Sequence, residues 1–189
     1  MLENKVAFVT GAAQGIGYAI AKEFAAQGAN VALADYNEKE VKEVAKKMNA
    51  EYKGEIWPVV ADVSKSAAVD KCIAEVVEHF GKIDYAINNA GGGILKPFAE
   101  LTDEDFNKTV NVDFFGTFYC MRAEIKQFLK QGRFSIDTVS IWERGLQLQT
   151  AILFLFRCNY GGKSEINTIG KPGDKTGISR CNRSQHFFP

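Results

Sequence analysis

The sequence predicts a three-layer α/β fold in which helices cover both faces of a parallel sheet. Short apolar segments alternate with longer segments of helical periodicity from residue 5 to about residue 140, an order that is typical of strand–helix–strand units. The apolar segments lack strict polar alternation, which indicates strands that are buried on both faces. A turn with three glycines joins the first apolar segment to the first helical one.

Five strands and four helices are expected. The strands are predicted at Lys5–Thr10, Asn30–Ala34, Ile56–Ala61, Ile83–Asn88 and Phe134–Ser140. The helices are predicted at Gly15–Gln27, Glu38–Asn49, Ser66–Phe80 and Asp103–Lys130. Asp103 and Glu104 follow Thr102 and place acids at the positive end of the fourth helix, whereas Gly28 and Gly81 stand where helices end. With right-handed crossovers, these elements give a Rossmann-like, doubly wound sheet.

Composition excludes several classes of function. A chain of 189 residues is one domain by length, and its 23 basic and 23 acidic residues give no positive field for nucleic acid. No apolar run reaches the length of a membrane helix, and the first strand begins too early for a signal peptide. The four cysteines show no metal-ligand spacing, so we expect reduced thiols in a cytoplasmic protein. We interpret His79 as a helix-end residue rather than a ligand.

The glycine turn is the strongest functional signal. Thr10-Gly11-Ala12-Ala13-Gln14-Gly15-Ile16-Gly17 follows an apolar strand and opens an amphipathic helix. Glycines in this context allow a tight turn, close approach to a pyrophosphate and close helix–strand packing. Free N–H groups and the helix dipole then favour the phosphate charge, which predicts a dinucleotide site. A plain strand–helix turn is the alternative, in which the glycines serve geometry alone.

Asp35 points to NAD as the cofactor. It ends the second predicted strand, where an acid binds the ribose hydroxyls in dinucleotide folds. A carboxylate there repels the 2′-phosphate of NADP, and the turn offers no basic residue to receive it, since Ala12, Ala13, Gln14 and Tyr18 are uncharged. The alternative is a solvated acid before the second helix.

Three further motifs follow the glycine turn. They are Asp62-Val63 after the third strand, Asn88-Asn89-Ala90-Gly91 at the end of the fourth strand with Asp84 before it, and Asn111-Val112-Asp113-Phe114-Phe115-Gly116 in the fourth helix. Together with the turn, they resemble the short-chain dehydrogenase/reductase family over residues 3–140. The resemblance implies hydride transfer between NAD and a small alcohol or carbonyl substrate. It also implies a subunit interface on the fourth helix, and therefore a homo-oligomer.

The same resemblance implies roles for individual residues. Gly11, Gln14, Gly15, Ile16 and Gly17 would hold the cofactor beside Asp35. Asp62 and Val63 would bracket the adenine ring, and Asn89, Ala90 and Gly91 would line the cofactor near its ribose. Asn111 would support a water chain that relays protons, and Ser140 would hold the substrate oxygen.

The proton donor departs from the family pattern. A tyrosine and, four residues later, a lysine are implied after Ser140, but Leu153 and Arg157 stand there. Leucine transfers no proton, and arginine keeps its charge without replacing a phenol. Tyr160 and Lys163 are the candidate pair, although two intervening glycines disfavour a helix by about 1 kcal/mol each. The alternative is that Tyr160 lies in a flexible loop and Lys163 is solvated, and that neither is catalytic.

Tyr160 and Lys163 are three residues apart rather than four, and a different tyrosine and lysine have the spacing of the family pair. Tyr18 and Lys22 are four residues apart, but they follow the glycine turn on the first helix. Lys22 is expected to face solvent there, so we do not interpret this pair as catalytic.

Residues 141–189 are predicted to be a poorly ordered tail rather than a domain of their own. Glycines interrupt the segment, no amphipathic helix can be drawn from Gly161 onward, and from Ala151 its net charge is about +4. The family pattern stops near Ser140, so we expect a sheet truncated after its fifth strand. We expect the coding frame to change within or near 141–152, through a frameshift, a misprediction or an alternative exon. Besides an NAD-dependent dehydrogenase in residues 1–140, two alternatives stay open. One is a catalytically inactive nucleotide-binding fragment or interaction subunit, and the other is a nonfunctional product.

Overall fold

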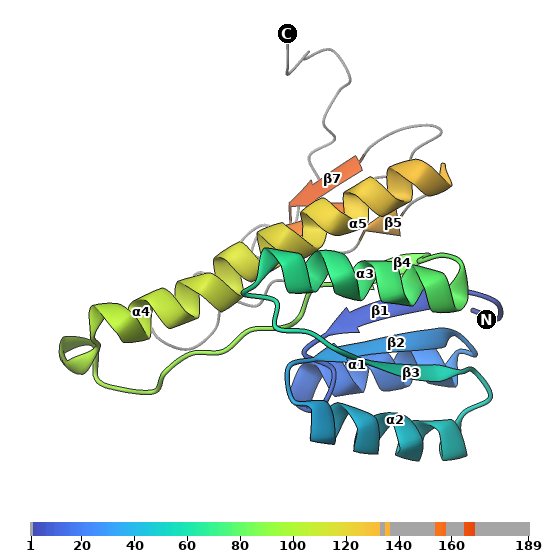
Figure 1. Cartoon of the computed structure of the whole chain (residues 1–189), viewed down its shortest axis with the longest axis horizontal. Helices are drawn as coiled ribbons and strands as arrows, with labels where there is room; N and C mark the ends of the chain where they lie inside the picture. The colour runs from blue at the N-terminus through green and yellow to red at the C-terminus, as the bar shows by residue number, and fades with distance from the viewer. Residues whose placement is uncertain (1, 133–134, 137–153, 158–164, 169–189) are drawn as a thin grey trace, which may run out of the picture.

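A five-stranded parallel sheet forms the centre of the molecule. The computed structural model describes residues 2–132, 135–136, 154–157 and 165–168 (Figure 1). The strands of the sheet are β1 (Val6–Thr10), β2 (Asn30–Asp35), β3 (Ile56–Val60), β4 (Tyr85–Ile87) and β5 (Ser135–Ile136). Their order is β3-β2-β1-β4-β5, and every neighbouring pair is parallel. The predicted α/β class with a doubly wound parallel sheet is confirmed.

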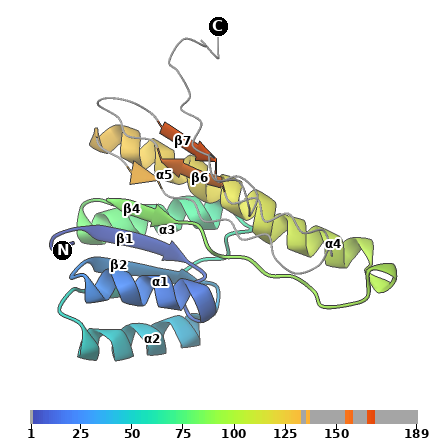
Figure 2. The same ribbon diagram turned by 180° about the vertical axis from the view of Figure 1, so that it is seen from behind.

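Helices cover both faces of the sheet, as predicted. The helices are α1 (Gly15–Ala26), α2 (Glu38–Glu51), α3 (Ser66–Phe80), η1 (Phe98–Glu100), α4 (Asp103–Val110), η2 (Asn111–Gly116) and α5 (Thr117–Gln131). In the two opposite views, α1 and α3 lie on opposite sides of the strands (Figures 1 and 2). Successive strand residues therefore enter different cores, with Phe8 facing α3 and α5 and Val9 facing α1 and α2. This explains why the strands are apolar throughout.

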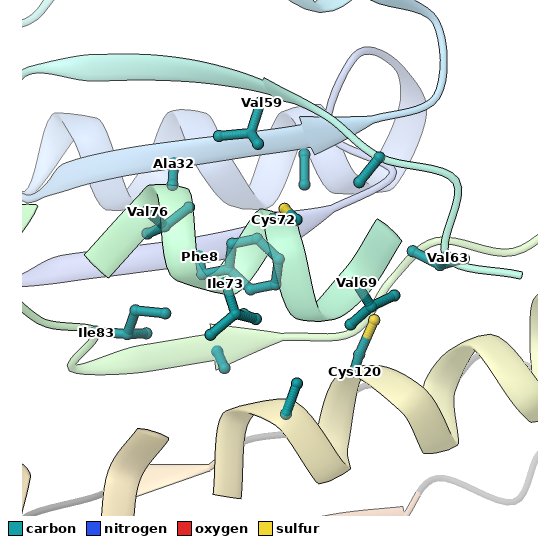
Figure 3. Packing of buried hydrophobic residues seen from close by; sticks show 14 of the residues in the cluster. Phe8, Ala32, Val59, Val63, Val69, Cys72, Ile73, Val76, Ile83 and Cys120 are labelled. Carbon is teal, nitrogen blue, oxygen red and sulfur yellow. The ribbon is translucent and has the colours of Figure 1, made fainter. Parts of the chain in front are cut away.

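The core between the sheet, α3 and α5 is densely filled with side chains (Figure 3). Phe8 from β1 lies in this layer with Val69, Cys72, Ile73 and other apolar residues, all nearly inaccessible to water. Cys72 and Cys120 are free thiols. Burial raises the pKa of Cys72 to about 12, which leaves this thiol protonated and unreactive.

Two predicted elements differ from those observed by more than small shifts of their ends. The first three strands and the first two helices shift by one or two residues at an end, and most of the predicted fifth strand lies outside the described residues. The fourth strand covers Tyr85–Ile87 rather than Ile83–Asn88, because the side chain of Gln131 takes both backbone hydrogen bonds of Ile83. The fourth helix is a continuous rod made of α4, η2 and α5, and its middle part, η2, has π-helical geometry. The α4 end of the rod projects beyond the sheet (Figures 1 and 2).

Part of the tail forms a hairpin. Strands β6 (Phe154–Arg157) and β7 (Glu165–Thr168) pair antiparallel, with Phe154 opposite Thr168. Arg157 therefore belongs to a strand, whereas Ser140, Leu153, Tyr160 and Lys163 lie outside the described residues. For the rest of segment 141–189, poor order stays a prediction.

Candidate nucleotide-binding site

The glycine turn brings the end of β1 against the first turn of α1. Gly11 and Gly15 have φ angles of +62° and +59°, which side-chain-bearing residues rarely adopt. A Cβ added at Gly17 would lie 2.2 Å from the Gly11 carbonyl oxygen and 2.5 Å from Asn89 Nδ2. The helix can approach the turn this closely only because residue 17 has no side chain.

Thr10 and Asn89 fasten this turn to the end of β4. The Thr10 hydroxyl oxygen accepts hydrogen bonds from the backbone N–H groups of Asn89 and Ala90, both at 3.0 Å. In the opposite direction, Asn89 Nδ2 donates to the carbonyl oxygens of Thr10 at 3.0 Å and Gly11 at 3.3 Å. Residues 10–17 and 88–91, far apart in the sequence, thus form one rigid surface at the carboxyl edge of the sheet.

The N-terminus of α1 is open on this surface. No side chain caps it, in contrast to α2, which Asn37 caps, and α4, which has a capping box of Thr102 and Asp105. Gln14, Gly15 and Ile16 are exposed, and a Cβ at Gly15 would meet nothing within 4 Å. The first N–H groups of the helix, with its positive dipole end, are therefore available to an anionic ligand.

Asp35 connects the turn to the end of β2. Its Oδ2 accepts a hydrogen bond from the Ala13 N–H at 3.1 Å, and its Oδ1 accepts one from the Asn37 N–H at 3.0 Å. The residue is 7% exposed, so the carboxylate is fixed rather than solvated. Each oxygen keeps a further acceptor position for a hydroxyl donor.

Asp62 and Val63 follow β3 beside Asp35. The Ala61 N–H donates to the Asp35 carbonyl oxygen at 2.9 Å, which sets the path of the chain after the strand. Asp62 Oδ1 accepts hydrogen bonds from the N–H and hydroxyl of Ser64, at 3.0 and 2.7 Å. A Cβ at Gly116 would lie 2.8 Å from Val63 Cγ2, so the end of η2 packs directly on this loop.

Asn111 begins the π-helical segment, and its side chain is exposed. Two residues later, Asp113 Oδ1 accepts a hydrogen bond from the Gly92 N–H at 2.9 Å. Burial raises the pKa of the Asp113 carboxyl, and this hydrogen bond partly opposes the shift. The segment that carries Asn111 is thereby tied to the loop after Asn89, Ala90 and Gly91. Deviations from α-helical geometry of this kind are frequent at functional sites.

The structure thus gathers most of the predicted cofactor residues. Tyr18 lies directly beside them, since its N–H donates to the Gln14 carbonyl oxygen at 3.2 Å, whereas Lys22 lies apart. Gly11, Gly17, Asn89 and Ala90 share hydrogen bonds or close contacts, and Asp35 accepts a hydrogen bond from Ala13 of the same turn, with Asp62 and Val63 beside it. Gly15 is exposed at the start of α1, with nothing within 4 Å of its Cβ position. Lys22 is 3.5 Å from Glu51 at the α2 side, in an exposed ion pair. This position agrees with its prediction as a solvent-facing residue.

Sequence reasoning missed two residues of this edge. Thr10 is the first residue of the glycine turn, but only the structure shows that its hydroxyl joins β1 to the loop after β4. Asp113 was part of a motif as well, and its bond to Gly92 spans 21 positions of the chain. In both cases the sequence shows a short polar side chain within a motif. It does not show which distant backbone group that side chain bonds.

Comparison with known proteins agrees with this geometry. The family model described as short chain dehydrogenase matches residues 5–141. A 2,3-dihydro-2,3-dihydroxybenzoate dehydrogenase of Bacillus subtilis is 40% identical over 141 residues, which are 73% of this chain and 52% of that protein. A sorbitol dehydrogenase of Cereibacter sphaeroides is 35% identical over 132 residues, covering 70% of this chain and 50% of that protein. The chain spans about half the length of these curated relatives.

A solved structure shows the same fold. An alcohol dehydrogenase from the archaeon Thermococcus sibiricus, complexed with 5-hydroxy-NADP, superposes with a TM-score of 0.67 at 31% identity. The match covers 72% of this chain and 58% of that one. With the family model matched from Lys5 to Ile141, this chain belongs to the short-chain dehydrogenase family.

Proposed function

We propose that the chain binds NAD and serves hydride transfer between its nicotinamide and an alcohol or carbonyl substrate. The observation that carries this proposal is the open N-terminus of α1, which lies on a surface fixed by Thr10, Asn89 and Asp35. The residues fit a dinucleotide, because Gly15 leaves space where a pyrophosphate approaches and Asp35 offers acceptors to ribose hydroxyls. When bound, the nicotinamide supplies the hydride donor or acceptor.

The choice of NAD over NADP rests on local charge. Asp35 is a fixed carboxylate, and Glu38 and Glu40 follow it in the first turn of α2, flanking the basic Lys39. A 2′-phosphate beside Asp35 would face a net negative charge with low solvent screening. The Thermococcus sibiricus relative is complexed with an NADP derivative, so cofactor preference is tested separately below.

For the chemistry, we propose Asn111, Ser140, Tyr160 and Lys163. The loop contact between Asp113 and Gly92 supports a fixed position for the Asn111 segment. Ser140 would hold the substrate oxygen, and Tyr160 would move the proton that accompanies hydride transfer, with the Lys163 ammonium favouring the phenolate. This pair replaces the family positions that Leu153 and Arg157 occupy.

We also propose a cytoplasmic homo-oligomer that acts on a small molecule. Cysteines without disulfide spacing support a reducing compartment. Of the described helices, none is long and apolar enough to cross a membrane. An apolar stripe on η2 and α5 supports the oligomer, since its members are 40–60% exposed: Phe114, Phe118, Ile125 and Leu129. Their spacing places them on one side of the rod.

The first prediction concerns the open helix end. Replacing Gly15 with Leu is expected to weaken NAD⁺ binding about tenfold or more in titration calorimetry, because the side chain would cover the pyrophosphate position. Gly81→Leu is the matched control, since Gly81 also has a positive φ with nothing within 4 Å of its Cβ position and ends α3. Equal losses in both variants would show that backbone strain, not the site, accounts for the effect.

The second prediction concerns cofactor choice. Asp35→Asn is expected to shift the ratio of NADP⁺ to NAD⁺ affinity about tenfold toward NADP⁺, because the repulsive charge is removed. Glu38→Gln serves as a control, as its exposed carboxylate is paired with Lys42. Tighter binding of NADP⁺ than of NAD⁺ by the unmodified chain would overturn the assignment.

The third prediction concerns turnover. NADH formation would be followed with sorbitol and meso-2,3-butanediol, compounds named for two relatives. Tyr160→Phe is expected to lower the rate about 100-fold or more, because the phenolic proton donor is lost. Tyr18→Phe should leave turnover intact. NAD⁺ binding without turnover in the unmodified chain would instead support a nucleotide-binding subunit.

The fourth prediction concerns association. The double variant Phe118→Glu, Leu129→Glu is expected to sediment as a 20.9 kDa monomer, because two charges would interrupt the apolar stripe. Lys130→Glu changes charge at the neighbouring position and should leave the assembly intact. A monomeric unmodified chain would exclude this interface.

A further inference from the structure

A carboxylic acid occupies the apolar core between the sheet and α5. Glu124 is 0% exposed, and it continues a buried face of α5 whose other members, Cys120 and Phe128, are 1% and 0% exposed. Residues four positions apart lie on one side of a helix, so Glu124 points into the same layer as Cys120. Cys120 is labelled in Figure 3. A buried carboxylate is costly unless it is paired, and no cation is bonded to this one among the described residues.

The partner of Glu124 is the side-chain amide of Asn88. This residue begins the loop after β4, residues 88–91, which we call the cofactor loop because it lies at the proposed cofactor site. Asn88 Nδ2 donates a hydrogen bond to Glu124 Oε2 at 2.9 Å. The two remaining side-chain oxygens of this pair, Asn88 Oδ1 and Glu124 Oε1, are both buried and have no hydrogen-bond partner among the described residues. Two acceptors cannot bond to each other, but a proton on Glu124 supplies the donor that Asn88 Oδ1 lacks. One proton shared between Glu124 Oε1 and Asn88 Oδ1 would satisfy both oxygens.

We propose that Glu124 is a positioning residue whose neutral acid form pairs with the Asn88 amide through two hydrogen bonds and so holds the cofactor loop. The proposal rests on the proposed function, because its consequence is an NAD affinity that depends on this proton. No bond is made or broken to the cofactor. The proton is taken up from water and is released to water when the pair opens.

The path from Glu124 to the cofactor edge is short. Asn88 is followed by Asn89 and Ala90, whose N–H groups donate to the Thr10 hydroxyl. The loop is thus held from one side by β1 and from the other by α5 through Asn88. When Glu124 ionises, a buried charge is left with one hydrogen bond, and the structure relieves it by moving Asn88 or admitting water. Either change loosens the surface that includes Gly11.

The surroundings of Glu124 favour the neutral form near neutral pH. From α3 it faces Cys72 and from α5 Cys120, both neutral thiols that its charge influences, and Glu75 adds a further negative charge near Cys72. Arg122 Nη2 is bonded to Ser66 Oγ at 2.7 Å, and its Nε has no partner. Burial raises the pKa of Glu124 to about 7, against the opposing effect of the Asn88 bond.

The expected pH dependence has a definite sign. Since the pKa of Glu124 is about 7 in the folded chain and about 4.3 in an unfolded one, stability falls as pH rises through this interval and then levels off. Cofactor affinity depends on whether Glu124 is protonated in the folded chain, so it should fall above about pH 7. Glu124→Gln keeps a donor for Asn88 Oδ1 at every pH, so it should remove this dependence.

The fifth prediction is tested by NAD⁺ titrations between about pH 6 and pH 8.5 on the full chain. The unmodified chain should lose affinity about fivefold or more across this range, and Glu124→Gln should retain the low-pH affinity throughout. His79→Gln controls for the histidine on α3, and Glu75→Gln controls for the neighbouring acid. Both controls should keep the dependence of the unmodified chain. The same dependence in Glu124→Gln, or a flat profile in the unmodified chain, would overturn the proposal.

Infrared spectroscopy provides a readout that needs no cofactor. The carbonyl stretch of a protonated, buried carboxylic acid should be present at about pH 6, where ordinary carboxyl groups are ionised, and disappear as pH rises through about 7. It should be absent in Glu124→Gln. If no nicotinamide cofactor binds at any pH, the proposed function fails, while this band still decides whether Glu124 carries the proton. A spectrum without the band would show Glu124 to be ionised and would exclude the neutral pair.

Discussion

The close approach of α1 to β1 is the constraint on which the rest of this structure depends. Gly17 lies so near the Gly11 carbonyl and Asn89 that a single methyl group would not fit. This contact fixes where α1 begins and leaves its N–H groups open, and it places β4 close enough for Thr10 to bond to the following loop. The strand order with β1 between β2 and β4 then brings Asp35 and Asn89 to opposite sides of the same turn.

The glycine turn is supported differently on its two sides. Toward β2, backbone N–H groups hold Asp35 at 3.0 and 3.1 Å, so its charge is fixed. Toward α5, the bond that the described residues form is between the side chains of Asn88 and Glu124. Burial raises the pKa of the Glu124 carboxyl to about 7. A change of pH near neutrality would therefore act on the loop after β4 through this pair.

The sequence allowed the sheet, and the residues that meet at the edge proposed for the cofactor, to be predicted, because local chemistry decides them. Positive φ values at Gly11 and Gly15 and the strand before them are properties of a short segment. The π-helical geometry of η2 has no such local signal, since the segment reads as ordinary helix. Glu124 could not be interpreted either, because its partner Asn88 lies 36 positions away. A charged residue on an apolar helix face was the available signal.

The proposed cofactor binding and the proposed turnover rest on separate parts of this chain. The surface proposed for a dinucleotide is built from residues 10–116, within the segment 5–141 that the family model matches. The groups proposed for proton transfer, Tyr160 and Lys163, come after that segment. Because the turn is held by Thr10, Asn89 and Asp35, its geometry does not require them. An inactive chain that binds NAD and an active one would therefore share the same glycine turn, and only the proton donor distinguishes them.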